Sequence, residues 1–282
     1  IAGLRPTAGR VPSYTATAGE ARPFSAQVMA VQGPLARNMR DIRLGLQAMS
    51  AGDPRDPTWV AAPLTWPTTR APIRVALVDE IEGATVAPEV RAALAQAARW
   101  LEQEGYVVEH ASLPQMREVQ DVWMSIAMTD VRIGMLSAVD KFGDDAIRNA
   151  VHGMLDNAPV LDLNGYMQAI ARRDALRRKW SVFLAQYPLI LMPTSCQLPF
   201  QWGLDQQGPA VTKQILAAQS PMMAIAALSL PGLNVPTGLV GNVPVGVQLV
   251  AGSFREDLCI TAGEAIERHA AMPKSYEMPS AA

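Results

Sequence analysis

A strand–helix–strand unit sets the class of fold that this chain can adopt. IRVALVDE (73–80) is a β-branched apolar strand, and YVVEHASL (106–113) is a second strand. The segment between them, 87–105, is typical of a helix, with Pro88 near its first turn and Gly105 at its end. Two strands joined by a helical crossover lie parallel in a right-handed connection. The unit therefore predicts an α/β fold.

Further elements follow from similar patterns. A short, wholly apolar strand, PLILMPT (188–194), is of the kind buried on both faces of a sheet. GLNVPTGLV and PVGVQLVAG, separated by Gly241 and Asn242, predict a hairpin. Asn38 followed by Asp41 resembles a helix cap, in which a side chain satisfies a free backbone N–H group. We expect helices over 33–52, 163–187, 210–229 and 254–269, a mostly helical segment over 118–157, and a strand with an unpaired edge over 1–5.

The helix expected over 163–187 carries basic residues on two sides. At about 100° per residue, Arg173 and Arg177 fall on the apolar face together with Trp180. Because an unpaired buried charge is costly, we expect these two arginines to find structural partners or to reach the surface, in preference to recognising a substrate. The basic residues of the opposite face are expected to be solvated: Arg172, Arg178 and Lys179.

Composition excludes several classes of protein. Of 282 residues, 49% are hydrophobic and 18% are charged, which indicates a large apolar core and argues against disorder. The net charge of −2, without a long basic block, gives no reason to expect nucleic acid or an anionic membrane as a partner. Cys196 and Cys259 stand far apart, without zinc-ligand spacing, so we interpret them as buried apolar residues and expect a reducing, cytoplasmic setting.

The residues carry none of the common catalytic signatures. No GxSxG elbow precedes a helix, the three histidines are scattered, and no HExxH, Walker or GxGxxG motif is present. Asp144 and Asp145 are neighbours on a helix and point to different faces, which argues against a glycosidase-like carboxylate pair. No metal and no cofactor are expected. The residues alone thus define an α/β protein without a visible active site.

Several motifs resemble those of a known family. GLRPTAGRVP (3–12), GPLAR (33–37) at the expected start of a helix, and DPRDP (53–57) occur in that order. YPLILMPT resembles the family's apolar strand ending in a Pro-Thr step. SLPGLNVPTG, followed by VPVGVQLVAGSFREDLCITAGEAIE, resembles its closing hairpin and helix. Over essentially all of residues 1–282, the chain resembles the C-terminal part of a single amidase signature domain. The resemblance implies an α/β fold with a mixed β-sheet core covered by helices.

The resemblance implies hydrolysis of amide C–N bonds by a serine nucleophile, a serine held by a cis peptide bond, and a lysine base. The lysine must be neutral to accept a proton, and burial favours that form. In the family, these three residues lie upstream of GLRPTxGRVP, so the resemblance implies that they lie outside this chain and that residues 1–282 are a fragment, inactive alone. No serine present, such as Ser195 or Ser229, stands in the family's motif, so we assign no catalytic residue.

The same resemblance gives candidate substrate-binding residues. By position, Met192 and the loop TSCQLPFQWG (194–203), which includes Trp202, line one wall of the acyl pocket together with Met222 and Met223. The alternative is that these are ordinary core methionines, because methionine fills irregular gaps in protein cores. If the residues do line the wall, the pocket is apolar and favours small aliphatic or aromatic amides.

Two other functions stay open. The A-type subunit of a tRNA amidotransferase shares the fold but acts on glutamine with a partner protein; where such subunits carry an acid, this chain has AAQS (217–220). A non-catalytic remnant would keep the fold and lack the chemistry. For the amidase we expect a small-molecule amide as the partner, and no nucleic acid or membrane; a homodimer is compatible with this interpretation.

Overall fold

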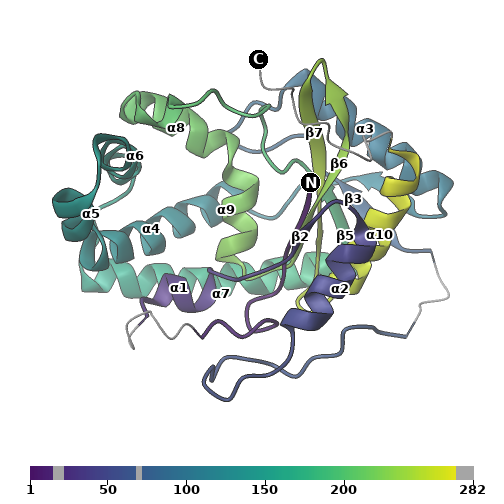
Figure 1. Ribbon diagram of the computed structural model, residues 1–282, viewed down its shortest axis with the longest axis horizontal. Helices are drawn as coiled ribbons and strands as arrows, with labels where there is room; N and C mark the ends of the chain where they lie inside the picture. The colour runs from purple at the N-terminus through teal and green to yellow at the C-terminus, as the bar shows by residue number, and fades with distance from the viewer. Residues whose placement is uncertain (15–21, 68–71, 271–282) are drawn as a thin grey trace, which may run out of the picture.

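The computed structural model describes residues 1–14, 22–67 and 72–270. Within these ranges, seven strands form one sheet in the order β2-β1-β6-β7-β5-β3-β4 (Figure 1). The strands are β1 (Ala2–Arg5), β2 (Leu35–Ala36), β3 (Arg74–Leu77), β4 (Val107–His110), β5 (Leu189–Met192), β6 (Gly232–Val240) and β7 (Val243–Ala251). The helices are α1 (Phe24–Val28), α2 (Met39–Met49), α3 (Pro88–Gln103), α4 (Met116–Gly134), α5 (Leu136–Phe142), α6 (Asp145–Asp156), α7 (Leu163–Gln186), α8 (Pro209–Ala218), α9 (Ser220–Ala227) and α10 (Glu256–His269), with a 3₁₀ turn at Leu204–Gln206.

The predicted strand–helix–strand unit is confirmed. β3 and β4 pair in parallel, with Arg74 opposite Val107, and α3 forms the crossover between them. β5 lies parallel to β3 on its other side, whereas β7 is antiparallel to β5. β6 and β7 form the predicted hairpin, which turns at Gly241, where a φ of 59° suits a residue without a Cβ. The sheet is therefore mixed, as predicted.

Helices cover both faces of the sheet. Gly232 and Leu233 are successive residues of β6 and point to opposite faces. On the side of Leu233, α10 packs so closely that a Cβ on Gly263 would lie 2.7 Å from Leu233 Cδ2. On the side of Gly232, α9 approaches, and Ile225 Cδ1 is 2.5 Å from the position of a Cβ on Gly232. Figure 1 shows α2 and α10 on one side of the sheet and the group from α4 to α8 extending away from the other.

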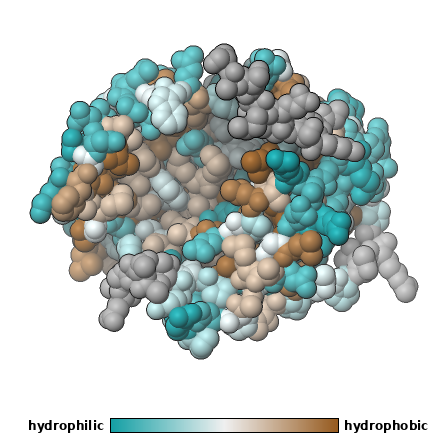
Figure 2. All heavy atoms as spheres, viewed as in Figure 1, coloured by the Kyte–Doolittle hydropathy of each residue, from teal (hydrophilic) through white to brown (hydrophobic). Residues whose placement is uncertain are grey.

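The helices away from the sheet have a small apolar cluster of their own. Its members come from α4, α5, α6, α8 and α9: Met124, Ala127, Met128, Val139, Val151, Leu155, Leu216 and Met223. Figure 2 shows that the face between this helical group and the sheet is hollowed, with hydrophobic residues on its floor. Over the described ranges, no helix by itself has the length and apolar character needed to cross a membrane. α4 and α5 reach that length and apolar character only together, and they are bent by 55° relative to each other.

The amino-terminal region differs from the sequence prediction. The helix expected from residue 33 begins at Met39, after Asn38, whose side chain accepts a hydrogen bond from the Asp41 N–H at 2.8 Å. Instead, Leu35 and Ala36 of the GPLAR segment form β2. Only a glycine fits at position 33, because a Cβ there would lie 1.9 Å from Leu4 O and would clash with β1. β1 pairs antiparallel with both β2 and β6, so the predicted unpaired edge on residues 1–5 is wrong.

The segment 210–229 also differs from its prediction as a single helix. It forms two helices, α8 and α9, which meet at Gln219. Pro221 lies in the first turn of α9, where its missing N–H is harmless, but it cannot donate the hydrogen bond that would continue α8. Pro221 thus explains why α8 ends before it and why a new helix, α9, begins at Ser220.

The arginines of α7 behave as predicted. Arg173 is buried and donates to Ala227 O at 2.6 Å and to the Ser229 hydroxyl, while Arg177 Nε donates to Leu228 O at 3.3 Å. On the outer side, Arg172 pairs with Glu118, Arg178 pairs with Asp174, and Lys179 donates to the Gln115 side chain. Arg173 and Arg177 therefore bind backbone carbonyl groups at the carboxyl end of α9. Arg173 is buried and Arg177 is exposed; on the outer side, Arg172 is half-buried and Arg178 and Lys179 are exposed.

Candidate functional site

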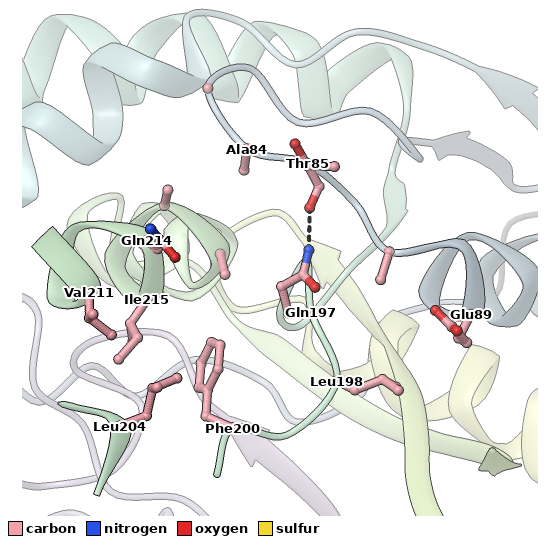
Figure 3. A pocket seen from close by; sticks show the side chains of 14 residues that line it. Ala84, Thr85, Glu89, Gln197, Leu198, Phe200, Leu204, Val211, Gln214 and Ile215 are labelled. Atoms are coloured by element: carbon pink, nitrogen blue, oxygen red, sulfur yellow. Dashed lines mark hydrogen bonds between the residues drawn. The ribbon is translucent and has the colours of Figure 1, made fainter. Parts of the chain in front are cut away.

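A cavity lies at the carboxyl ends of two neighbouring parallel strands, β3 and β5. Its volume is about 640 Å³, which is within the usual range for small-molecule sites. Three segments surround it: residues 83–89 after β3, residues 197–204 after β5, and one side of α8 (Figure 3). Ligands of α/β proteins commonly bind outside the carboxyl ends of the strands. We therefore take this cavity as the candidate functional site.

The α8 wall of the cavity arises from helical spacing. Gln214, Ile215 and Ala218 follow Val211 by three, four and seven residues, so the four share one side of the helix, which faces the cavity. α8 begins at Pro209, whose fixed φ suits the first helical position. Figure 3 shows the side chains of Val211 and Ile215 beside those of Phe200 and Leu204, so this end of the cavity is apolar and carries an aromatic ring.

Hydrogen bonds fasten the loop after β5 to both neighbouring walls. Cys196 O accepts from the Ala87 N–H at 2.8 Å, and Cys196 N–H donates to Ala218 O at 2.8 Å. Gln197 Nε2 donates to Thr85 O at 2.7 Å, across the cavity in Figure 3. Burial raises the pKa of Cys196 to about 12, so its thiol is protonated at neutral pH and is not a nucleophile. The backbone hydrogen bonds of Cys196, and not its thiol, therefore hold the loop after β5 in place as a wall of the cavity.

The cavity has little charge. Glu89, exposed in the first turn of α3, is the one ionisable side chain among its described lining residues, and no lysine, arginine or histidine lines it. The side-chain amide of Gln197 donates to Thr85 O, whereas the side-chain amide of Gln214 is exposed and makes no hydrogen bond with another described residue. The site can therefore enclose an apolar or aromatic group and offer it one amide, and it lacks a nucleophile–base pair of its own.

The sequence-predicted site residues lie elsewhere. Met192 is fully buried in the main core, Met223 belongs to the smaller apolar cluster, Met222 is half-buried, and Trp202 is fully exposed. None of the four lines the cavity, and their assignment to substrate stays a prediction. The predicted loop 194–203 does contribute lining residues: Gln197, Leu198 and Phe200.

Sequence reasoning missed the two other walls. Thr85 and Glu89 stand in the crossover after β3, and the α8 residues stand in what reads as an ordinary apolar helix. One available signal was the parallel pairing of two apolar strands, because the segments that leave their carboxyl ends meet at one edge of the sheet. The sequence did not show that β3 and β5, which are more than a hundred residues apart along the chain, are neighbours in the sheet.

A polar contact joins the segment after β5 to β6, the strand that pairs with β1. Thr194 Oγ1 donates to Asn234 Oδ1 at 2.7 Å, and Asn234 stands opposite Gly3 in the pairing of β6 with β1. The amino end of β1 therefore lies at the same edge of the sheet as the carboxyl end of β5, with β6 and β7 between them, and the loop lining the cavity departs from that edge. Ile1 is largely exposed at this position.

The fold and these segments match one family of proteins. A model of the Amidase family matches residues 1–260, and the chain belongs to this family. Indoleacetamide hydrolase of Bradyrhizobium japonicum is 40% identical over 271 residues, which are 96% of this chain and 58% of that protein. The A-type subunit of glutamyl-tRNA(Gln) amidotransferase from Moorella thermoacetica is 25% identical, over 95% of this chain and 59% of that protein. The chain thus spans less than two thirds of the length of these relatives.

Solved structures show the same fold. The structure of 6-aminohexanoate cyclic dimer hydrolase complexed with substrate matches with a TM-score of 0.73 and 20% identity, over 96% of this chain and 61% of that one. A bacterial aryl acylamidase of the amidase signature enzymes matches with a TM-score of 0.72 and 19% identity, over 95% of this chain and 58% of that one. At these identities the likeness concerns the fold.

Proposed function

We propose that this chain is part of an enzyme that hydrolyses the C–N bond of small neutral amides with an aliphatic or aromatic acyl group. Membership of the Amidase family supports the reaction class. The observation that carries the choice of substrate is the cavity at the ends of β3 and β5, which has an apolar, aromatic wall and no cationic side chain among its described lining residues. The relative that hydrolyses indoleacetamide, at 40% identity, supports an aromatic amide.

In the proposed reaction, a serine oxygen attacks the amide carbonyl carbon, the C–N bond breaks, and the nitrogen leaves as ammonia after taking a proton. Water then cleaves the acyl-serine ester and releases a carboxylate. We propose that the two serines and the lysine lie outside residues 1–282. The direction of β1 supports this, since its amino end and the loop that lines the cavity lie at the same edge of the sheet.

Lack of positive charge favours a hydrolase of neutral amides over a glutamine-dependent amidotransferase. Glutamine carries a carboxylate, and proteins usually bind a carboxylate through arginine, lysine or backbone N–H groups. Glu89 would repel that carboxylate at the mouth of the cavity. The proposal therefore places neutral aromatic amides ahead of glutamine. It also includes a cytoplasmic setting, supported by two cysteines that are buried and unpaired.

The test is the substrate preference of the polypeptide extended upstream through its natural reading frame. Ammonia release from arylacetamides, short aliphatic amides and glutamine is compared at equal concentrations. The proposal predicts turnover of the neutral amides and at least about ten-fold lower kcat/KM for glutamine. Phe200→Ala should raise KM for the aromatic amide more than for the aliphatic amide. Preference for glutamine would point to an amidotransferase, and no turnover of any amide would point to a non-catalytic protein.

A further inference from the structure

A second, smaller cavity lies at the opposite end of β5 from the first. Gly252 and Ser253, which line it, follow Ala251, and Ala251 pairs with Leu189 at the amino end of β5. Its volume is about 240 Å³, enough for a molecule with a single ring or a short chain. The remaining lining residues come from the carboxyl-terminal half of α7 and the segment after α9: Arg177, Trp180, Ser181, Leu184, Ala185, Leu228 and Leu230.

The floor of this second cavity is apolar. Trp180, Leu184, Leu228 and Leu230 line it, and each is at most 7% exposed. The indole N–H of Trp180 already donates to Pro114 O at 2.9 Å, so this side chain has no free polar atom for a ligand. A ligand on the floor would gain by removing its own apolar surface from water.

The mouth of the second cavity is polar and positively charged. Arg177, Ser181 and Ser253 line it and are exposed. Arg177 Nε donates to Leu228 O at 3.3 Å, which orients the guanidinium, and its terminal N–H groups make no ion pair with a described carboxylate. Its neighbour Arg178, in contrast, is paired with Asp174. Arg177 thus offers oriented donors that are still available to a ligand.

A second arginine adds to the positive charge behind the cavity. Arg173, one helical turn before Arg177, is buried, and its partners are the neutral oxygens of Ala227 and Ser229. Burial lowers the pKa of Arg173 to about 10, and the nearby charge of Arg177 contributes in the same direction, while the carboxylate of Asp174, which is paired with Arg178, partly opposes both. An anion bound at Arg177 would relieve this repulsion between like charges. The pair therefore favours an anionic group at the mouth of the cavity.

We propose that the second cavity binds a small organic carboxylate with an apolar or aromatic tail. The tail lies on the floor formed by Trp180, Leu184 and Leu230, and the carboxylate accepts hydrogen bonds from Arg177 and a serine hydroxyl at the mouth. The acid formed by amide hydrolysis belongs to this chemical class, whereas the neutral amide does not. If the proposed function holds, the second cavity is a site for the product, separate from the site for the substrate.

The test uses the 282-residue chain and two probes of the same shape, phenylacetate and phenylacetamide. Calorimetric titration should show phenylacetate binding at least about ten-fold more tightly than phenylacetamide at low salt, with the difference shrinking as salt rises. Arg177→Gln should weaken phenylacetate binding at least about ten-fold. Arg178→Gln is the matched control and should leave it unchanged. These results do not depend on catalysis, so they stand or fall separately from the amidase proposal.

Three outcomes would overturn the proposal. The first is equal affinity for the acid and the amide, and the second is unchanged phenylacetate binding in Arg177→Gln. The third is loss of phenylacetate binding in Phe200→Ala, since that would locate the acid in the first cavity. Should Arg177→Gln unfold, Arg177→Lys tests the same point: it keeps the charge but loses the planar fork, so a several-fold weakening is expected and unchanged affinity would contradict the proposal.

Discussion

The buried ion pair between Arg10 and Glu256 is expected to be costly to break, because either partner alone would be a buried charge without a counter-ion. Both side chains are 2% exposed, and Arg10 Nη2 donates to Glu256 Oε2 at 2.9 Å. The same carboxylate accepts from Arg10 Nε at 3.2 Å and, through Oε1, from the Thr7 N–H at 2.8 Å. These bonds join the loop after β1 to the start of α10, 246 residues further along the chain.

Glu256→Gln should therefore be strongly destabilising. The glutamine side chain has one oxygen and one N–H₂ group, so it can accept a hydrogen bond from Thr7 or from Arg10 but presents a donor to the other. In either orientation the Arg10 guanidinium is buried without an anion. Removing one partner of a buried pair costs about 3–5 kcal/mol. In a chain of this size, a loss of about 3 kcal/mol lowers the melting midpoint by about 6–12 °C. Urea and thermal unfolding followed by circular dichroism measure both quantities.

The same helix provides the matched control. Glu264 pairs with Arg43, and the two side chains are 38% (Arg43) and 33% (Glu264) exposed, so Glu264→Gln should cost less than about 1 kcal/mol. Because Arg10 and Glu256 act as a unit, the double variant Arg10→Met/Glu256→Gln should lose less free energy of unfolding than the sum of the single variants. Equal losses for Glu256→Gln and Glu264→Gln would refute the assignment of the Arg10–Glu256 pair as a buried, desolvated contact.

Three further predictions concern local features. Asn38→Ala removes the cap of α2 and should cost about 1 kcal/mol in free energy of unfolding, whereas Asn38→Asp should cost less. Burial raises the pKa of both Cys196 and Cys259, so a thiol reagent should label neither in the native chain and both after unfolding; native labelling would contradict their burial. Burial and the bond to Asp130 raise the pKa of Tyr166, so its stabilising effect is complete below about pH 10 and is lost as the pH rises through the folded-state pKa; ultraviolet titration should show that Tyr166→Phe removes a late-ionising phenol.

Local patterns were the part of the fold that sequence could predict. The helix cap at Asn38, the turn at Gly241 and the crossover helix α3 each depend on residues within a few positions or within one unit, and all three are confirmed. The predictions that failed depend on distant partners. GPLAR forms β2 because β1 provides a strand to pair with, and the close approach of Gly33 to Leu4 O is visible only after the chain has folded.

The candidate site was harder to predict because its walls are distant in sequence. The segments 83–89, 197–204 and 211–218 meet only because β3 and β5 are neighbours in the sheet. Methionine patterns could not replace this information. The sequence allowed two interpretations of Met192 and Met223, as core residues or, by their position in the family, as pocket residues. In the structure both are buried in apolar clusters. The loop 194–203 was predicted from the family resemblance, by its position after the Pro-Thr step that ends the apolar strand.

The central claim is that amide hydrolysis needs residues outside 1–282 together with the cavity described above. The most direct measurement is ammonia release from an arylacetamide by the 282-residue chain and by the polypeptide extended upstream through its natural reading frame, at equal concentrations. The account predicts turnover by the extended form, with a higher KM in its Phe200→Ala variant, and no turnover by the shorter chain. Turnover by the shorter chain would contradict the placement of the catalytic serines and lysine, and inactivity of the extended form would contradict the proposed hydrolysis.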